Sequence, residues 1–143
     1  MNQILEIFTD GACSGNPGQA GIGVVLKQQG KVVGEISQGI GQATNNIAEY
    51  MAVIYGLQEA LIQRFQDVTV YTDSELLCNQ FNRIYKVKNE NLKPLFDQIQ
   101  HLMRGFHQVK VRHIPRNQNK DADHLAKKAV KSEQAKMVAS LFD

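Results

Sequence analysis

The sequence predicts an α/β domain in which a mixed β-sheet is covered by helices. Apolar strand-like segments open the chain, the hydrophobic period then becomes helical, and strands alternate with helices afterwards. The hairpin-rich first half favours antiparallel pairing, and the later alternation favours parallel strands joined by crossovers. Because the 143 residues contain no internal repeat and no linker, we expect a single domain over residues 1–143.

The first half of the chain predicts three strands. Residues 4–10 are apolar and rich in strand formers, and the turn-forming residues 11–18 follow them. Residues 22–27 and 32–37 are the next two strands. The residues between them, 28–30, predict a tight antiparallel hairpin.

Helical periodicity begins near Asn46. Apolar residues recur every three or four positions as far as Leu61, which is one face of an amphipathic helix. Asn46 and Glu49 have the spacing of a capping box, so we expect Glu49 in the first turn. The elements expected after it are a strand at 68–73, helices at 74–81 and 92–103, a strand at 109–114 that stops at Pro115, a loop at 116–119, and a helix that continues into the tail.

Composition limits the possible classes. The hydrophobic content of 43% and charged content of 21% are ordinary for a globular protein. No apolar run approaches the roughly 18 residues of a membrane span, and no secretory signal is present, so we expect a cytoplasmic protein. The net charge of +2 is too small to identify a nucleic-acid binder by itself. Cys13 and Cys78 lack metal-ligand spacing and are expected to be reduced packing residues.

Four carboxylates are the strongest candidates for chemistry. Asp10 and Asp73 each end a predicted strand, and adjacent parallel strands would bring both to the carboxyl edge of the sheet, where α/β sheets bind ligands. Glu49 and Asp123 fall in the first turns of helices that could point to the same edge. Singly, each acid has an ordinary alternative as a turn residue, a helix cap or a first-turn acid.

A cluster of four acids predicts a bound cation, because carboxylates brought together repel one another. Oxygen-only ligands favour Mg²⁺, with Mn²⁺ as a substitute. The four histidines form no metal-binding pair, which argues against zinc. Two divalent ions about 4 Å apart would suit in-line phosphoryl displacement, which needs no organic cofactor. The sequence therefore predicts a magnesium-dependent phosphodiesterase.

Four blocks of the sequence resemble ribonuclease HI. They are residues 8–18, 44–49, 72–74 and 113–126, they occur in the family's order, and the resemblance spans about residues 4–131. It implies a ribonuclease H-like fold with a five-stranded mixed sheet, three strands antiparallel and then two parallel, and helices on both faces. It also implies hydrolysis of the RNA strand of RNA–DNA hybrids by two metal ions, leaving 5′-phosphate and 3′-hydroxyl ends.

The resemblance also assigns roles to individual residues. Asp10, Glu49, Asp73 and Asp123 fall on the family's metal-binding acids, with Asp10 bridging the two ions. His113 falls on a histidine that assists proton transfer or product release, and its alternative is a strand-end residue without chemistry. The implied contacts to the hybrid come from the backbone of Gly11 and Cys13 and from Asn16, Asn45 and Asn46, with Thr44 near a DNA phosphate.

The chain departs from many bacterial relatives in two places. Glu75 stands where glutamine is common, and residues 82–91 are too short for the basic protrusion that grips the hybrid, as in the compact archaeal-type branch. Phosphate contacts must then come from other basic residues, and binding should be salt-sensitive. The candidates are Lys86, Lys88, Arg112, Arg116 and Lys120.

Two other functions remain open at this point. Glu75 and the missing protrusion would also suit a weakly active or inactive module that binds hybrids or RNA. A related-fold DNA nuclease, such as a transposase or junction resolvase, is the other alternative, against which the small size argues. The complete acid set favours the enzyme, because a binder gains nothing from negative charge beside phosphate. We expect a monomer whose partner is an RNA–DNA hybrid duplex, with no membrane and no organic cofactor.

Overall fold

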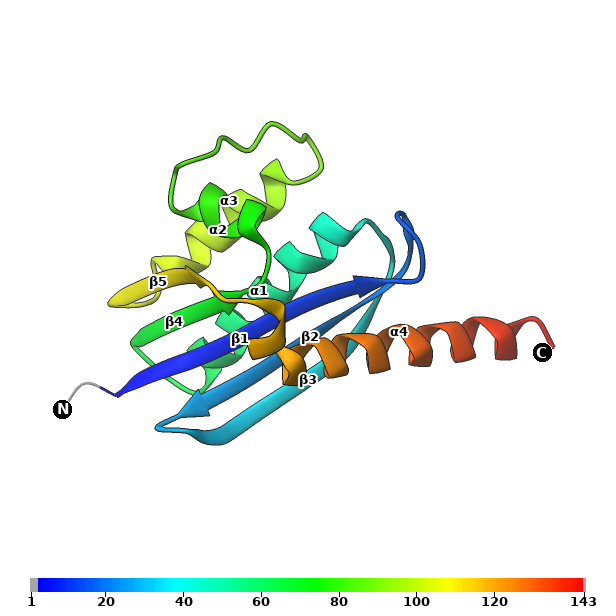
Figure 1. Ribbon diagram of the computed structural model, residues 1–143, viewed down its shortest axis with the longest axis horizontal. Helices are drawn as coiled ribbons and strands as arrows, with labels where there is room; N and C mark the ends of the chain where they lie inside the picture. Colours follow the sequence, from blue (N-terminus) through cyan, green and yellow to red (C-terminus); the bar gives the residue numbers. More distant parts are fainter. Residues whose placement is uncertain (1–2, 143) are drawn as a thin grey trace.

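A five-stranded sheet forms the centre of the molecule in the computed structural model, which describes residues 3–142 (Figure 1). Its strand order is β3-β2-β1-β4-β5. Pairing is antiparallel among β1, β2 and β3, whereas β4 and β5 run parallel to β1. The predicted mixed sheet is confirmed. The strands are β1 (Ile4–Cys13), β2 (Gly18–Gln28), β3 (Lys31–Ala43), β4 (Asp67–Thr72) and β5 (Gln108–His113).

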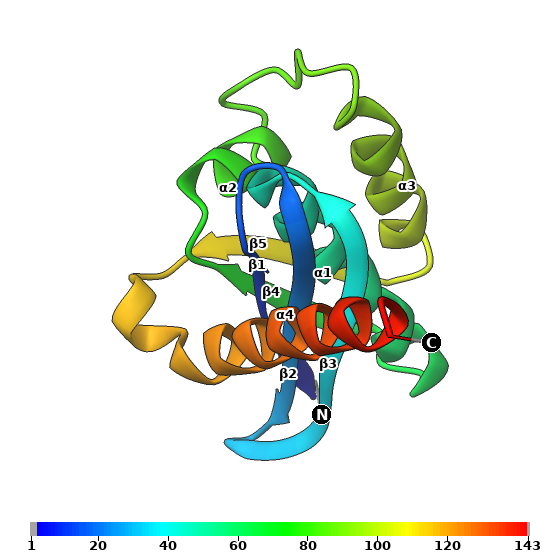
Figure 2. The same cartoon turned by 90° about the vertical axis from the view of Figure 1, so that its right-hand side faces the viewer.

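Helices cover both faces of the sheet, as the two views show (Figures 1 and 2). On β2, Val24 lies against Gly56 of α1, whereas the next residue back, Gly23, lies against α4 on the opposite face. Helix α3 packs on α1 rather than on the sheet. The helices are α1 (Asn45–Ile62), α2 (Glu75–Phe81), α3 (Lys93–Met103) and α4 (Lys120–Ser140), and a short 3₁₀ turn, η1 (Arg116–Gln118), precedes α4.

The main core lies between the sheet and α1. Leu5 and Ile7 of β1 and Leu57 of α1 are completely buried, and Tyr50 is nearly so. Their burial explains the helical period in the sequence, because one stripe of α1 faces the sheet. The core therefore holds α1 against β1.

Two glycines of β2 let α4 lie directly on the sheet. A Cβ atom on Gly23 would overlap the carbonyl oxygen of Ala122, and one on Gly21 would lie 2.5 Å from the Cβ of Ala129. Alanines on the facing side of α4 complete the close contact. The position of α4 relative to β2 is thus set by small residues on both elements.

The first strands are longer than predicted. Residues 11–13, expected in a turn, continue β1 and pair with β2, so that the turn is confined to residues 14–17. Gly11 allows this because a Cβ there would lie 2.5 Å from the backbone of Ala48 in α1. The hairpin at Gln29 and Gly30 is confirmed, with φ values of 51° and 79° that suit a two-residue turn.

The predicted capping box at the start of α1 is wrong. Thr44 is the N-cap, and its Oγ1 accepts a hydrogen bond of 3.2 Å from the backbone N–H of Ile47. The helix begins at Asn45, which places Glu49 in the second turn rather than the first. The carboxylate of Glu49 is therefore free of a capping role.

The later elements agree closely with the prediction. Residues 82–92 contain no helix, so the segment between α2 and α3 is a loop, which extends outward from the helices (Figure 1). The tail is a continuation of α4, which runs past the sheet (Figure 1). Within residues 3–142, none of the helices combines the length and apolar character that crossing a membrane requires.

Candidate active site

The ends of β1 and β4 lie side by side and in register. Thr9 pairs with Thr72, so the next residues, Asp10 and Asp73, emerge together at the carboxyl edge. Both threonines are completely buried. The hydroxyl of Thr9 donates to the carbonyl of Tyr71 at 3.1 Å, and that of Thr72 accepts from the N–H of Ser74 at 3.0 Å. The expected parallel arrangement of the two strand ends is confirmed.

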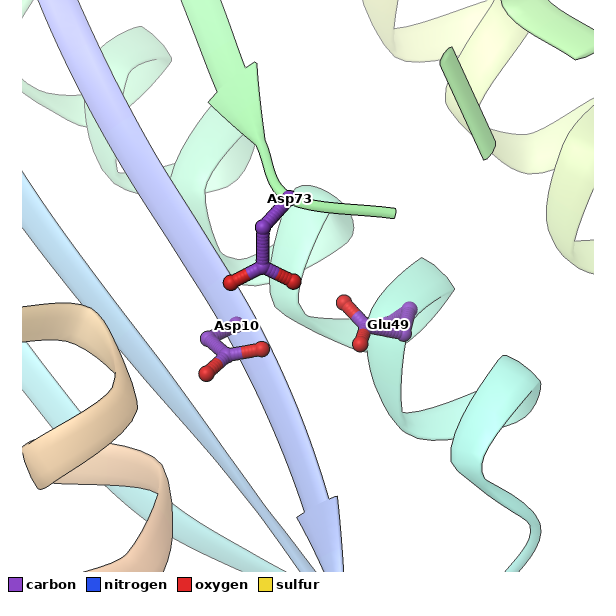
Figure 3. A group of neighbouring side chains, drawn as sticks. All are labelled: Asp10, Glu49 and Asp73. Carbon is purple, nitrogen blue, oxygen red and sulfur yellow. The ribbon is translucent and has the colours of Figure 1, made fainter. Parts of the chain in front are cut away.

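Three of the four predicted acids meet at this edge. Asp10, Glu49 and Asp73 each offer a carboxylate oxygen, and these oxygens all lie within 4.8 Å of one another (Figure 3). The three side chains point toward one another from β1, from α1 and from the residue after β4. Asp10 is only 4% exposed, and Oε2 of Glu49 is buried without a hydrogen-bond partner.

The protein alone does not neutralise this cluster. Burial raises the pKa of Asp10 to about 8, with further contributions from the charge of Asp73 and from Asp123, although the Gly11 N–H opposes the rise. Burial and then the charges of Asp10 and Asp73 raise the pKa of Glu49 well above its ordinary value. Crowded carboxylates with raised pKa values favour either protons or a cation at this position.

Asp123 lies beside Asp10 but outside the group of three. It is in the first turn of α4, and its Oδ2 is 2.9 Å from Nζ of Lys127, one turn further along. Burial alone would raise the pKa of Asp123, but hydrogen bonds from Lys127 and Asp10 and the charge of Lys127 outweigh it and lower the pKa. The ammonium group of Lys127 therefore compensates the negative charge of Asp123.

His113 and Glu75 lie outside the acid group. His113 is the exposed last residue of β5 and pairs with Thr72, one strand away from Asp10. Glu75 is exposed at the first residue of α2, directly after the N-cap Ser74. An acid there is stabilised by the helix dipole, so Glu75 has a structural reason to occupy that position.

The residues expected to contact a hybrid gather near the start of α1. Oδ1 of Asn16 accepts a 3.0 Å hydrogen bond from the backbone N–H of Asn45, which joins the β1–β2 turn to the helix. Asn45 and Asn46 are exposed, and Thr44 caps the helix just before them. The thiol of Cys13, at the end of β1, donates a hydrogen bond of 3.5 Å to the carbonyl of Ala43, the residue before Thr44.

Asn119 is a residue of this site that sequence reasoning placed only in a loop. It is 1% exposed, and its Nδ2 donates to the carbonyl of Thr9 at 2.9 Å and to Oδ2 of Asp73 at 3.1 Å. The sequence hints at a role for Asn119 only through its position four residues before Asp123. That spacing is common at helix starts, so it could not have identified a contact to Asp73.

Comparison with known proteins decides the family. Residues 8–129 match the family described as "Reverse transcriptase-like". A protein from Halobacterium salinarum named ribonuclease HI is 36% identical over 127 residues, which are 88% of this chain and 64% of that protein. The chain belongs to the ribonuclease HI family of hydrolases. Mycobacterial relatives are longer: a bifunctional protein of Mycobacterium tuberculosis is 39% identical over 132 residues, and the chain spans only 36% of its length.

The fold of ribonuclease HI is also found in solved structures. The crystal structure of LC11 ribonuclease H1 in complex with an RNA/DNA hybrid superposes with a TM-score of 0.87 and 39% identity, covering 91% of this chain and 99% of that one. The arrangement of strands and helices described above is therefore that of a ribonuclease HI domain.

Proposed function

We propose that this protein hydrolyses the RNA strand of RNA–DNA hybrids with two Mg²⁺ ions, leaving 5′-phosphate and 3′-hydroxyl ends. The observation that carries the proposal is the partly buried group of Asp10, Glu49 and Asp73 in a chain of the ribonuclease HI family. The hybrid bound to the LC11 relative supports the choice of substrate.

The acid group fits divalent ions. Its donors are carboxylate oxygens, which hard cations such as Mg²⁺ and Mn²⁺ prefer. One oxygen of Glu49 is buried without a partner, and burial and the neighbouring carboxylates raise the pKa values of Asp10 and Glu49, although the charge of Arg116 opposes the rise at Glu49. Asp10, Glu49, Asp73 and Asp123 would hold the ions. Such a pair of ions activates the attacking water and stabilises the leaving oxygen in phosphodiester hydrolysis.

The chain's own residues would orient the hybrid. Only the 2′-hydroxyl distinguishes RNA from DNA at a given position, and amides recognise it well because they can both donate and accept hydrogen bonds. Asn45 and Asn46 lie in the first turn of α1, the helix that carries Glu49, and the hydrogen bond between Asn45 and Asn16 joins the β1–β2 turn to that helix. The backbone of Gly11 and Cys13 completes this proposed minor-groove contact.

Other residues contribute more weakly to the proposed site. Thr44 would contact a DNA phosphate, and His113 would assist proton transfer or product release from the end of β5. Phosphate contacts without a protrusion fall to Lys86, Lys88, Arg112, Arg116 and Lys120, all of which are exposed. Exposed basic contacts predict binding that weakens steeply with salt. The cytoplasmic location and the monomeric state remain predictions from the sequence.

A cleavage assay with end-labelled substrates tests the proposal. The parent should cut the RNA of a hybrid in Mg²⁺, leave RNA–RNA and DNA–DNA duplexes intact, and give 5′-phosphorylated products. Asp10→Asn should be inactive. Asp121→Asn is a matched control, because Asp121 lies in the same first turn as Asp123 but its side chain is 74% exposed. Hybrid binding without cleavage in either Mg²⁺ or Mn²⁺ would instead indicate a binding module.

A further inference from the structure

Asn119 contacts three of the four parts of the chain that carry the acids, two through its side chain and one through its backbone carbonyl. Nδ2 donates one hydrogen bond to the carbonyl of Thr9, the residue before Asp10, and a second to Oδ2 of Asp73. The carbonyl of Asn119 accepts a 3.1 Å hydrogen bond from the N–H of Asp123. One residue therefore contacts the end of β1, the residue after β4 and the first turn of α4.

Chemistry fixes the orientation of this amide. Both neighbours of Nδ2 are oxygen acceptors, so rotating the amide by 180° would bring Oδ1 against a carbonyl and a carboxylate. The observed orientation leaves Oδ1 buried without a partner. A buried acceptor without a partner costs free energy, which indicates that the two donated bonds determine the position of the side chain.

Asn119 also forgoes the ordinary role of asparagine at a helix start. It is the N-cap residue of α4, yet its side chain makes no capping hydrogen bond. Asparagine at this position usually accepts from a backbone N–H in the first turn. Here the amide points across to β1 and Asp73 instead.

We propose that Asn119 is a positioning residue that holds the Asp73 carboxylate in the place required for metal binding. This inference rests on the proposed function for its catalytic readout. A neutral donor suits the task because it restrains Oδ2 of Asp73 without neutralising it, whereas Lys127 restrains Asp123 with a full positive charge. The amide thus orders the carboxylate without competing with a cation.

Metal binding without substrate gives the first test. Calorimetric titration with Mg²⁺ and Mn²⁺ should show about 10-fold weaker binding for Asn119→Ala, the size typical of residues that orient metal ligands. With a hybrid substrate, kcat should fall about 30-fold while KM changes less than about 3-fold. Asn82→Ala is the matched control, since Asn82 also donates to a strand carbonyl, that of Val111 at 3.1 Å, but away from the acids.

Asn119→Asp provides a second variant of nearly identical shape. It places a carboxylate oxygen against two acceptors, so its loss of metal affinity and kcat should match or exceed that of Asn119→Ala. Circular dichroism and thermal unfolding establish that each variant is folded. If either folded variant matches the parent within about 2-fold in both metal affinity and kcat, the inference is wrong.

An Asp73→Ala background distinguishes positioning from a general structural effect, because alanine leaves Nδ2 of Asn119 no acceptor at residue 73, whereas asparagine would keep one. If Asn119 acts through Asp73, adding Asn119→Ala to Asp73→Ala should change Mn²⁺ affinity by less than about 2-fold. A further 10-fold loss in that background would overturn the inference. A parent that binds metal but cuts no hybrid would refute the proposed function alone, because the metal titrations would still report on Asn119.

Discussion

Asp10 and Asp123 are neighbours at one edge of the sheet, but their charges are handled in opposite ways. Burial and the charge of Asp73 raise the pKa of Asp10 to about 8, and Asp123 adds to the rise. The pKa of Asp123 is lowered because bonds from Lys127 and Asp10 outweigh the effect of burial. The comparison shows that burial and neighbouring acids dominate at Asp10, which belongs to the inner group with Glu49 and Asp73, whereas Lys127 compensates the charge of the outer acid, Asp123, within its own helix.

The largest expected effect follows from removing an inner charge. Asp10→Asn should lower the rate of hybrid cleavage by at least about 1,000-fold, because Asp10 is one of the three grouped carboxylates that would hold the ions. Gel analysis of a labelled hybrid under single-turnover conditions measures this. Cleavage within about 10-fold of the parent would mean that the acid group is not the catalytic site.

Removing the outer charge should matter less. Asp123→Asn is expected to lower kcat by about 10-fold, since Asp123 lies outside the group of three oxygens within 4.8 Å. The same single-turnover assay compares it directly with Asp10→Asn. If the two variants lose equal activity, the distinction between inner and outer acids does not hold for catalysis.

The inner acids should also make stability without metal depend on pH. The folded pKa of Asp10, about 8, exceeds its unfolded value of 3.8, so the folded state binds more protons between these values. Stability should therefore fall as pH rises from about 4 to about 8. Asp10→Asn removes this penalty and should stabilise the metal-free protein by roughly 1–3 kcal/mol at pH 8, with little difference at pH 4.

Urea unfolding in a metal chelator, at both pH values, measures that difference. Mg²⁺ should then raise the stability of the parent more than that of the variant, because only the parent retains the full acid group. A parent whose metal-free stability is the same at pH 4 and pH 8 would contradict the pKa assignment of Asp10.

The smallest effect is expected at the compensating lysine. Lys127→Met removes an exposed i, i+4 ion pair, so the free energy of unfolding should change by no more than about 0.5 kcal/mol. Cleavage at neutral pH should stay within about 3-fold of the parent, because Asp123 remains ionised there without help. Urea unfolding and the cleavage assay check both values, and a loss near that of Asp123→Asn would show that Lys127 has a larger role.

Patterns of the sequence predicted the sheet and the gathering of the acids for clear physical reasons. The repeated strand end of apolar residues, threonine and aspartate, at Asp10 and Asp73, fixed the edge at which both emerge once the strands paired in parallel. The helical period of the apolar residues predicted α1, and this helix brings Glu49 near that edge. These are local signals whose consequences follow from strand and helix geometry.

The features that escaped prediction depend on contacts distant in the sequence. β1 runs past Gly11 because the start of α1 lies against that glycine, which no local pattern reveals. Thr44 rather than Asn46 caps α1, although both residue types are good caps. The role of Asn119 depends on Thr9, 110 positions earlier, and on Asp73, 46 positions earlier.

The glycines of β2 have a consequence beyond packing. Gly21 and Gly23 set how deeply α4 sits on the sheet, and α4 carries Asp123 and begins directly after Asn119. A methyl group at Gly23 would lift the helix and draw both residues away from Asp10 and Asp73. The distance between α4 and β2 therefore affects the geometry of the active site, although the two glycines that set it lie beneath the helix.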